Sequence, residues 1–99
     1  IATLNEEVLT KMKNAGYYRI VMGIESGSEK TLRFMRKPVV LKKAREIIKI
    51  CNKLGIWTWS TFVIGFPEEK MEDIQKTIDF AKKSGLNFPR LGCSPFFHA

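Results

Sequence analysis

The sequence is poor in the side chains that bind metals or form disulfides. Its 99 residues include two cysteines, Cys51 and Cys93, and one histidine, His98. Cysteines so far apart exclude a disulfide-rich scaffold and a C-x-x-C metal knuckle, and one histidine cannot complete a zinc site with them. We therefore expect two free thiols, as in the reducing cytoplasm, and no metal ligand in this chain.

Long apolar runs are also missing. None approaches the roughly 18 residues of a membrane span, and residues 1–14 resemble an amphipathic helix rather than a signal peptide. Hydrophobic residues make up 44% of the chain and charged residues 27%, which argues against intrinsic disorder. The composition predicts one small domain over residues 1–99 with no membrane partner. Because the chain begins at Ile1, we expect it to be a piece of something longer.

Positive charge is unevenly distributed. The net charge is +7, yet residues 30–53 alone carry +8, from nine basic residues and Glu46. Two interpretations remain open. The cations form either the solvated outer face of an amphipathic helix or a phosphate-binding surface for a nucleic acid. The nine are Lys30, Arg33, Arg36, Lys37, Lys42, Lys43, Arg45, Lys49 and Lys53.

A helix, a helix-stopping glycine and a strand recur three times along the chain. The stops are Gly16, Gly55 and Gly85, and glycine favours this position because it takes the left-handed conformation easily. The order α-β-α-α-β-α-β predicts an α/β fold with a three-stranded parallel sheet and right-handed crossovers. The expected helices cover residues 4–15, 29–36, 40–54 and 69–83, and the expected strands cover 19–24, 57–64 and 90–95.

Local signals predict how these helices begin and which faces they bury. Thr3 or Asn5 would cap the first helix, and residues 26–29 read as a capping box for the second. The third helix has an apolar face that includes Cys51, which we expect in the core. The last helix shows an apolar stripe made of Met71, Ile74, Ile78 and Ala81.

Two strands contain continuous apolar runs, at residues 20–22 and 62–64. Such runs are typical of parallel strands buried on both faces. We therefore expect Trp57 and Trp59 to serve packing rather than base stacking. Because an open three-stranded parallel sheet has two bare edges, we also expect it to belong to a larger sheet or barrel, or to self-associate.

Ligands in α/β folds bind at the carboxyl ends of the strands. After the first strand, Gly23 and Gly27 would allow close approach of a ligand, and Glu25 would accept hydrogen bonds from a diol such as a ribose. Ser26 and Ser28 would hold an anion at the following helix start. The same run also fits an ordinary turn in which a serine caps the helix, and spacing alone does not decide.

A second strand end runs from Gly65 to Glu68, with Phe66 and Pro67 between them. Phe66 would offer a flat apolar surface for a base, and Gly65 would permit close contact. Pro67 and the two glutamates that follow it equally fit a simple loop and helix start.

Together these motifs resemble the radical S-adenosylmethionine (radical SAM) superfamily. The resemblance rests on residues 15–18, 23–28, 55–56 and 62–68, and it extends over nearly the whole chain. It is nearest to the branch that often carries a cobalamin-binding domain, and a similar order occurs in methylthiotransferases and coproporphyrinogen-oxidase-like members. The resemblance implies the second half of a six-stranded partial TIM barrel, with the cluster-binding first half absent.

The resemblance also implies cofactor contacts. Glu25 would bind the ribose of S-adenosylmethionine, and Ser26 would lie near its methionyl end. Arg36, Lys37 or Arg45 would meet the carboxylate of the cofactor. The remaining implied cofactor-binding residues are Gly23, Val63, Gly65, Phe66 and Ser94.

The implied adenine contact comes from the family pattern G-x-I-x-G-x-x-E over residues 61–68. Thr61 and Val63 depart from that pattern, whereas Gly65 and Glu68 keep it. Ser94 and Pro95 would add backbone contacts to the adenine at the end of the last strand.

The three cysteines of the family's C-x-x-x-C-x-x-C cluster motif have no counterpart here. The parent enzyme would cleave S-adenosylmethionine reductively at a 4Fe-4S cluster, and cobalamin is a further cofactor that the resemblance implies for some parents. We expect this chain alone to be inert, with no catalytic residue, and its main partner to be the missing N-terminal half of the barrel. A small basic module that binds RNA, or a structural half-barrel that self-associates, are the alternatives.

Overall fold

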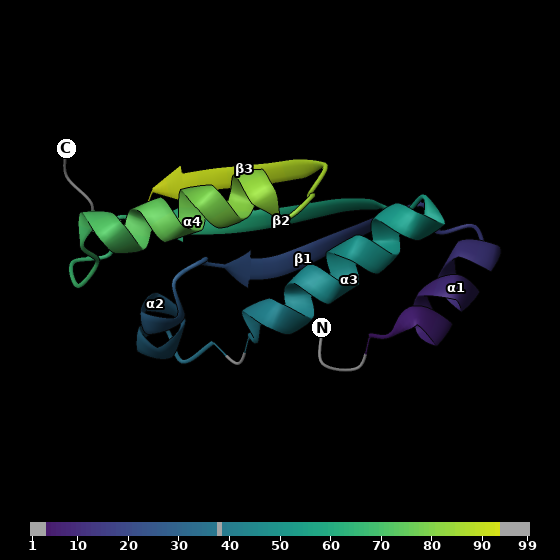
Figure 1. Cartoon of the computed structure of the whole chain (residues 1–99), viewed down its shortest axis with the longest axis horizontal. Coiled ribbons are helices and arrows are strands. Elements are labelled where there is room, and N and C mark those ends of the chain that lie inside the picture. Colours follow the sequence, from purple (N-terminus) through teal and green to yellow (C-terminus); the bar gives the residue numbers. More distant parts are fainter. Residues whose placement is uncertain (1–3, 38, 94–99) are drawn as a thin grey trace.

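A computed structural model of the chain describes residues 4–37 and 39–93. The strands form one parallel sheet in the order β1-β2-β3 (Figure 1). This α/β architecture confirms the predicted element order. The elements are α1 (Glu6–Asn14), β1 (Arg19–Glu25), α2 (Glu29–Phe34), α3 (Leu41–Leu54), β2 (Trp57–Ile64), α4 (Met71–Lys83) and β3 (Phe88–Cys93).

Side-chain caps explain where the first two helices begin. The Asn5 carboxamide oxygen accepts a hydrogen bond from the Val8 amide at 2.9 Å, which selects Asn5 as the cap of α1; Thr3 lies outside the described residues. In α2 the cap is Ser28, not Ser26 as the capping-box prediction requires. The prediction is wrong because Ser26 uses its hydroxyl elsewhere, as an acceptor for the Ser28 amide at 3.0 Å.

The core lies between the sheet and α3, with contributions from α1 and α4. The predicted apolar face of α3 is confirmed, since Leu41, Ala44, Ile47, Ile48 and Cys51 are all buried. Removing such side chains from water supplies the main driving force for folding. Burial also raises the pKa of the Cys51 thiol.

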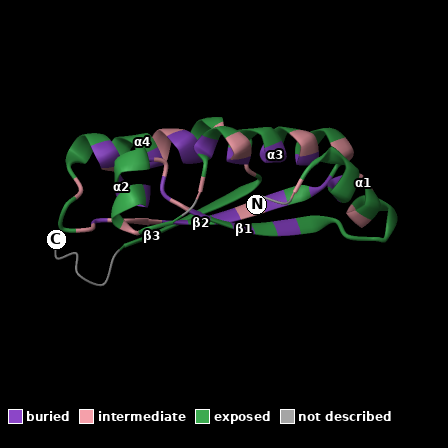
Figure 2. Ribbon diagram, turned by 90° about the horizontal axis from the view of Figure 1, so that it is seen from below, coloured by how far each residue is buried: buried purple, intermediate pink, exposed green. Residues whose placement is uncertain are grey.

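Among the described residues, helices cover one face of the sheet and leave the other open. The main helices α3 and α4 lie on the same side of the strands (Figure 2). Buried and exposed residues therefore alternate along β1, and Val21 is 64% exposed between two buried neighbours. The prediction of strands buried on both faces is wrong for these residues, because a continuous apolar run does not reveal whether a second layer is present.

The uncovered face carries an aromatic cluster near the amino end of the sheet. The Phe88 ring centroid lies 4.9 Å from that of Trp59 and 5.8 Å from that of Trp57, and the Arg19 guanidinium lies 5.0 Å from the Trp59 ring. Both tryptophans do pack, as predicted, but on the open face. Trp57 consequently remains 53% exposed.

The predicted stripe of α4 is only partly confirmed. Met71 is 75% exposed, and the fully or nearly buried residues are Asp73, Thr77, Phe80 and Ala81. Of the predicted stripe, Ala81 is buried, and Ile74 and Ile78 are half-buried. Polar residues of the helix face inward because the loop after β1 lies against them, with its Gly27 amide donating to the Thr77 hydroxyl at 3.0 Å.

The last strand runs over Phe88–Cys93 and starts two residues before its predicted position. All its residues are exposed, so both β3 and β1 end the sheet as bare edges within the described residues. Across those described ranges, no helix is long and apolar enough to cross a membrane.

Candidate functional site

The carboxyl ends of the strands gather on one side of the molecule, beside α2 and the start of α4 (Figure 1). Glu25 ends β1 with a φ of +72°, a left-handed conformation that is unusual for any residue but glycine. The register between β1 and β2 also shifts between Met22 and Glu25. This combination of bulge and left-handed residue re-aims the Glu25 side chain at the end of the strand.

Glu25, Thr61 and Lys37 surround Gly23 on the open face of the sheet. The Thr61 hydroxyl donates a hydrogen bond to the Glu25 carboxylate at 3.3 Å. A Cβ added at Gly23 would lie 3.3 Å from a Glu25 carboxylate oxygen and 3.8 Å from the Lys37 ammonium. The missing side chain of Gly23 thus leaves room between an acid and a cation. Such a place suits a ligand that offers hydroxyl groups to the acid and a carboxylate to the cation.

The two serines after Glu25 point inward. Ser26 and Ser28 are both fully buried. The Ser26 hydroxyl shares a hydrogen bond with the Thr77 hydroxyl at 3.1 Å, and the Ser28 hydroxyl donates to the Asp73 carboxylate at 3.1 Å. Their hydroxyls therefore bind α4, and the structure gives them no contact with the space around Gly23.

Gly27 approaches protein rather than a ligand. A Cβ at this position would lie 2.6 Å from the Lys76 carbonyl oxygen and 2.8 Å from the Thr77 Cα. Glycine is required here because the loop lies directly against the backbone of α4.

At the end of β2, Gly65 and Phe66 have their amides occupied. Both donate to one carboxylate oxygen of Glu69, at 2.8 Å and 3.2 Å. The family pattern ends on Glu68, which is exposed, so the acid that contacts this turn is its neighbour. The Phe66 ring packs edge-on against Phe34 of α2, with centroids 6.0 Å apart.

Val63 and Ser94 complete the set that the resemblance implies. Val63 is half-buried and pairs with Gly92 of β3. Ser94 and Pro95 lie outside the described residues.

The three basic candidates for a cofactor carboxylate lie in different places. Lys37 is beside Gly23, as described above. Arg36 is exposed and has a φ of +54°. Arg45 belongs to α3 and lies over the Phe80 ring at 4.9 Å, on the helix side of the sheet. Only Lys37 therefore has a described contact with the Gly23 region.

A polar row that starts just before α4 and continues along the helix is the feature that sequence patterns missed. Glu69, Asp73 and Thr77 follow one another at intervals of four residues and bind the loops after β1 and β2. Asp73 is only 2% exposed. Hydrogen bonds from the Lys70 amide and the Ser28 hydroxyl, together with the Lys30 charge, lower its pKa despite burial. Spacing of i, i+4, i+8 was the available signal.

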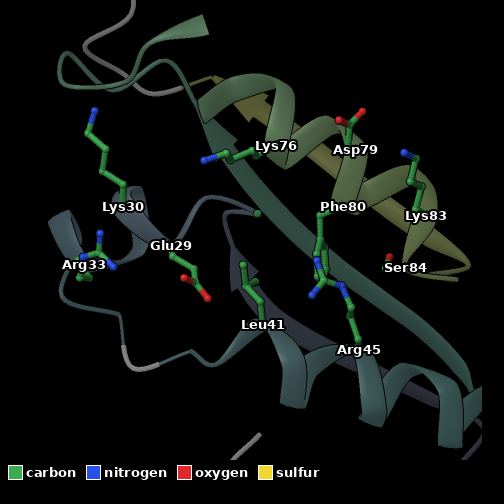
Figure 3. A pocket seen from close by; sticks show the side chains of 11 residues that line it. Glu29, Lys30, Arg33, Leu41, Arg45, Lys76, Asp79, Phe80, Lys83 and Ser84 are labelled. Carbon is green, nitrogen blue, oxygen red and sulfur yellow. The ribbon is translucent and has the colours of Figure 1, made fainter. Parts of the chain in front are cut away.

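A groove of about 560 Å³ opens on the helix side, between α2, α3 and α4 (Figure 3). Arg45 and Phe80 lie side by side within it, and Leu41 adds a second apolar side chain. The charged lining residues are mostly basic: Lys30, Arg33, Arg45, Lys76 and Lys83, against Glu29 and Asp79.

A parallel sheet with helices on its outer side and polar groups at its strand carboxyl ends is the construction of part of a (β/α) barrel. The sequence model of the radical SAM superfamily matches residues 1–81. The chain belongs to this superfamily. Membership implies S-adenosylmethionine and a 4Fe-4S cluster as cofactors at the level of the family.

Relatives with known names agree with this assignment. An uncharacterised methyltransferase of Pyrococcus horikoshii is 35% identical over 89% of this chain, and cytidylyl-2-hydroxyethylphosphonate methyltransferase of Streptomyces wedmorensis is 31% identical over 85%. The ribosomal protein uS12 methylthiotransferase of Pectobacterium atrosepticum is 38% identical over 74%. The matched regions make up 19%, 17% and 16% of these three relatives, respectively.

The fold matches a solved radical SAM enzyme. Coproporphyrinogen III oxidase from Escherichia coli superimposes with a TM-score of 0.81 over 92% of this chain and 21% of its own, at 14% sequence identity. The predicted fold class, a portion of a radical-SAM-type partial barrel, is thereby confirmed.

The described residues do not fit an iron–sulfur cluster. Within residues 4–37 and 39–93, no three potential metal-ligating side chains come together. Cys51 is in the core and Cys93 is exposed at the end of β3. The residues around Gly23 do fit part of S-adenosylmethionine, whose ribose hydroxyls and carboxylate match an acid and a cation.

Proposed function

We propose that this chain forms part of the S-adenosylmethionine site of a larger radical SAM enzyme. The observation that carries the proposal is the juxtaposition of Glu25, Thr61 and Lys37 around Gly23. Family membership and the small share of each relative that the chain spans support it. When bound beside a reduced cluster, the cofactor supplies radical chemistry; the residues described here bind and orient it.

Each residue of this group has a distinct proposed role. The Glu25 carboxylate accepts hydrogen bonds from the ribose hydroxyls, and Thr61 fixes its orientation through the 3.3 Å hydrogen bond. The Lys37 ammonium attracts the carboxylate of the cofactor. The Gly65 and Phe66 amides already donate to Glu69, so they are not free to bind the adenine. The adenine instead contacts Val63 and occupies the space that Gly65 leaves by having no side chain.

The cluster ligands would come from a preceding half of the same barrel. The open face of the sheet supports this arrangement, since Val21, Trp57 and Phe88 are 64%, 53% and 43% exposed. Apolar side chains exposed in one contiguous region mark a surface that another element covers. In the proposal that element is the rest of the barrel, and the chain by itself performs no catalysis.

The test is cofactor binding to the complete protein that contains this chain. Titration calorimetry should show that Glu25→Ala weakens S-adenosylmethionine binding by about tenfold or more, equivalent to about 1.4 kcal/mol. Glu46→Ala is the matched control, because Glu46 is an exposed acid on α3, outside the site. Equal affinities for wild type and Glu25→Ala would contradict the site. A gene without C-x-x-x-C-x-x-C in about 100 preceding residues would contradict the enzyme.

The basic groove favours a second candidate function, the binding of RNA phosphates. Five cations from three helices line it. Of these five, only Lys30 forms an ion pair with another described residue, Asp73 at 3.4 Å. Unpaired cations around a concave surface attract a polyanion. Arg45 over Phe80 adds a planar surface to the groove.

Filter binding of duplex RNA at two salt concentrations tests this candidate. Affinity should fall steeply between about 50 and 200 mM salt, because counterions are released when phosphates are neutralised. Substituting both Arg45 and Lys83 with Ala should remove most of the binding. Lys42→Ala with Lys49→Ala is the control of equal charge, since neither lysine lines the groove. No binding near 50 mM salt would rule the candidate out.

A further inference from the structure

Glu69, Asp73 and Thr77 form one polar row, which we call the α4 seam. Side chains four residues apart in a helix lie on the same face, and α4 begins between the first two of them. This face meets the loop after β1 and the turn after β2. The seam therefore lies between the two segments to which the proposed cofactor contacts belong.

Thr77 holds the loop that follows Glu25. Its hydroxyl accepts a hydrogen bond from the Gly27 amide at 3.0 Å and shares a second one with the Ser26 hydroxyl at 3.1 Å. Thr77 and Ser26 are fully buried. The loop backbone is fixed from the residue directly after Glu25 onward.

Asp73 holds the start of α2. One carboxylate oxygen accepts from the Ser28 hydroxyl at 3.1 Å, and the other accepts from the Lys70 amide at 3.0 Å and the Lys30 ammonium at 3.4 Å. A buried carboxylate with this many donors remains ionised. Its position fixes the Ser28 cap, and hence the direction in which α2 leaves the loop.

Glu69 joins the turn after β2 to helix α2. One of its carboxylate oxygens accepts from the Gly65 and Phe66 amides, at 2.8 Å and 3.2 Å. Its other oxygen accepts from the Thr31 hydroxyl at 2.9 Å. A single carboxylate thus connects the end of β2 with α2, which follows β1.

We infer that the α4 seam positions the cofactor site: Glu69, Asp73 and Thr77 fix the Glu25 loop relative to the Gly65 turn. This inference rests on the proposed function. The left-handed backbone of Glu25 requires such support, because an unfavourable φ persists only where neighbouring structure enforces it. A fully satisfied buried polar network holds one geometry, and a binding site gains affinity from supporting residues of this kind.

The experiment compares two buried threonines in the complete protein. Thr77→Val removes the seam hydroxyl. Thr58→Val removes a hydroxyl that is equally buried but lies at the start of β2, where it bonds with Asn87. Both variants should lower the thermal unfolding midpoint. Only Thr77→Val should weaken S-adenosylmethionine binding, by about fivefold, and Thr77→Ser should restore it.

A second pair of variants tests the connection to the turn after β2. Glu69→Ala should weaken cofactor binding by at least as much as Thr77→Val, because it releases the Gly65 and Phe66 amides as well as Thr31. Glu72→Ala is the matched control, since Glu72 is an exposed acid on the same helix. Hydrogen exchange adds a readout without cofactor: the Gly27 amide should exchange faster in Thr77→Val and remain unchanged in Thr58→Val.

The outcomes separate the two proposals. If Glu25→Ala weakens binding but Thr77→Val and Glu69→Ala do not, the seam inference is wrong and the proposed function stands. Equal losses of affinity in Thr77→Val and Thr58→Val also overturn the seam, since they reflect general destabilisation. If the wild-type protein binds no cofactor, the proposed function and the seam's role in it both fail.

Discussion

The two ends of the sheet are built differently. At the amino end the turns before the strands contain Gly16, Gly55 and Gly85, all with positive φ. The charged link between neighbouring helices there, Lys53 with Glu6 at 3.3 Å, lies at the surface. The partly buried links are uncharged, such as the Asn87 carboxamide oxygen that accepts from the Thr58 amide at 2.8 Å. Left-handed backbone at glycine carries little strain, so the turns at this end are formed without a large conformational penalty.

The carboxyl end uses buried charge and strained backbone instead. Glu25 adopts the left-handed conformation with a full side chain, and Asp73 is buried as a carboxylate. A non-glycine residue in this region costs on the order of 1–3 kcal/mol. The comparison teaches that stability alone explains the amino end, whereas the carboxyl end has the strain and buried charge that are typical of binding sites.

The largest expected effect on stability is that of Gly27→Ala at the carboxyl end, and Gly16→Ala at the amino end is its comparison. Gly27→Ala should destabilise the protein by about 3 kcal/mol or more, because the new Cβ would overlap the α4 backbone. Gly16→Ala should cost only about 1 kcal/mol, since its φ is +99° but nothing lies within 4 Å of the added Cβ. Thermal unfolding midpoints of the two variants measure the difference, and similar losses would contradict the close packing of the loop on α4.

Acidification should affect the carboxyl end first. The native pKa of Asp73 is lowered, so its contribution to stability is present above the unfolded value, about 3.9, and is lost as the pH falls through the native value. Unfolding midpoints measured from pH 6 to pH 2 should therefore decline less steeply in Asp73→Asn than in wild type. Glu72→Gln serves as the control, and parallel curves for Asp73→Asn and wild type would argue against this assignment.

Relief of the strain at Glu25 should separate stability from binding. Glu25→Gly should stabilise the fold by up to about 1 kcal/mol, because glycine accepts a φ of +72° without a steric penalty. The same variant should lose the proposed ribose contact and bind S-adenosylmethionine more weakly. A lower unfolding midpoint in Glu25→Gly would show that the side chain stabilises the strand end more than its backbone strains it.

The smallest effect concerns the two thiols, one toward each end. Cys93, on the exposed end of β3, should react with iodoacetamide in the folded protein, and buried Cys51 should not. Because burial raises the native pKa of Cys51, its contribution is complete below the unfolded value of about 8.5 and declines as the pH rises above it. Mass spectrometry after labelling, and unfolding midpoints from pH 7 to 9.5 with Cys51→Ala as control, test both statements.

Sequence patterns predicted the buried face of one main helix well and that of the other poorly. The face of α3 was predictable because its apolar residues recur at helical spacing against an apolar sheet. The face of α4 was not, because Asp73 and Thr77 are buried by hydrogen-bonding partners that lie more than 40 residues away in the sequence. Glu25 was singled out correctly as a special position at the strand end, but its left-handed backbone has no sequence signal in a residue other than glycine.

The identity of the glutamate that binds the turn after β2 illustrates the same limit. Two adjacent glutamates follow Pro67, and composition cannot distinguish them. Only the geometry of the turn decides that the Glu69 carboxylate reaches the Gly65 amide. The likeness of neighbouring residues therefore limits how finely a motif can be mapped onto a single chain.

Both tryptophans of the chain lie on β2, and their rings point to the open face. Their fluorescence consequently reports on that face alone. When another part of the barrel covers the sheet, the emission maximum should move to shorter wavelength as Trp57 leaves water. RNA bound in the groove on the opposite side should leave the emission unchanged. The protein thus carries an intrinsic optical probe that separates assembly of the barrel from events on its outer surface.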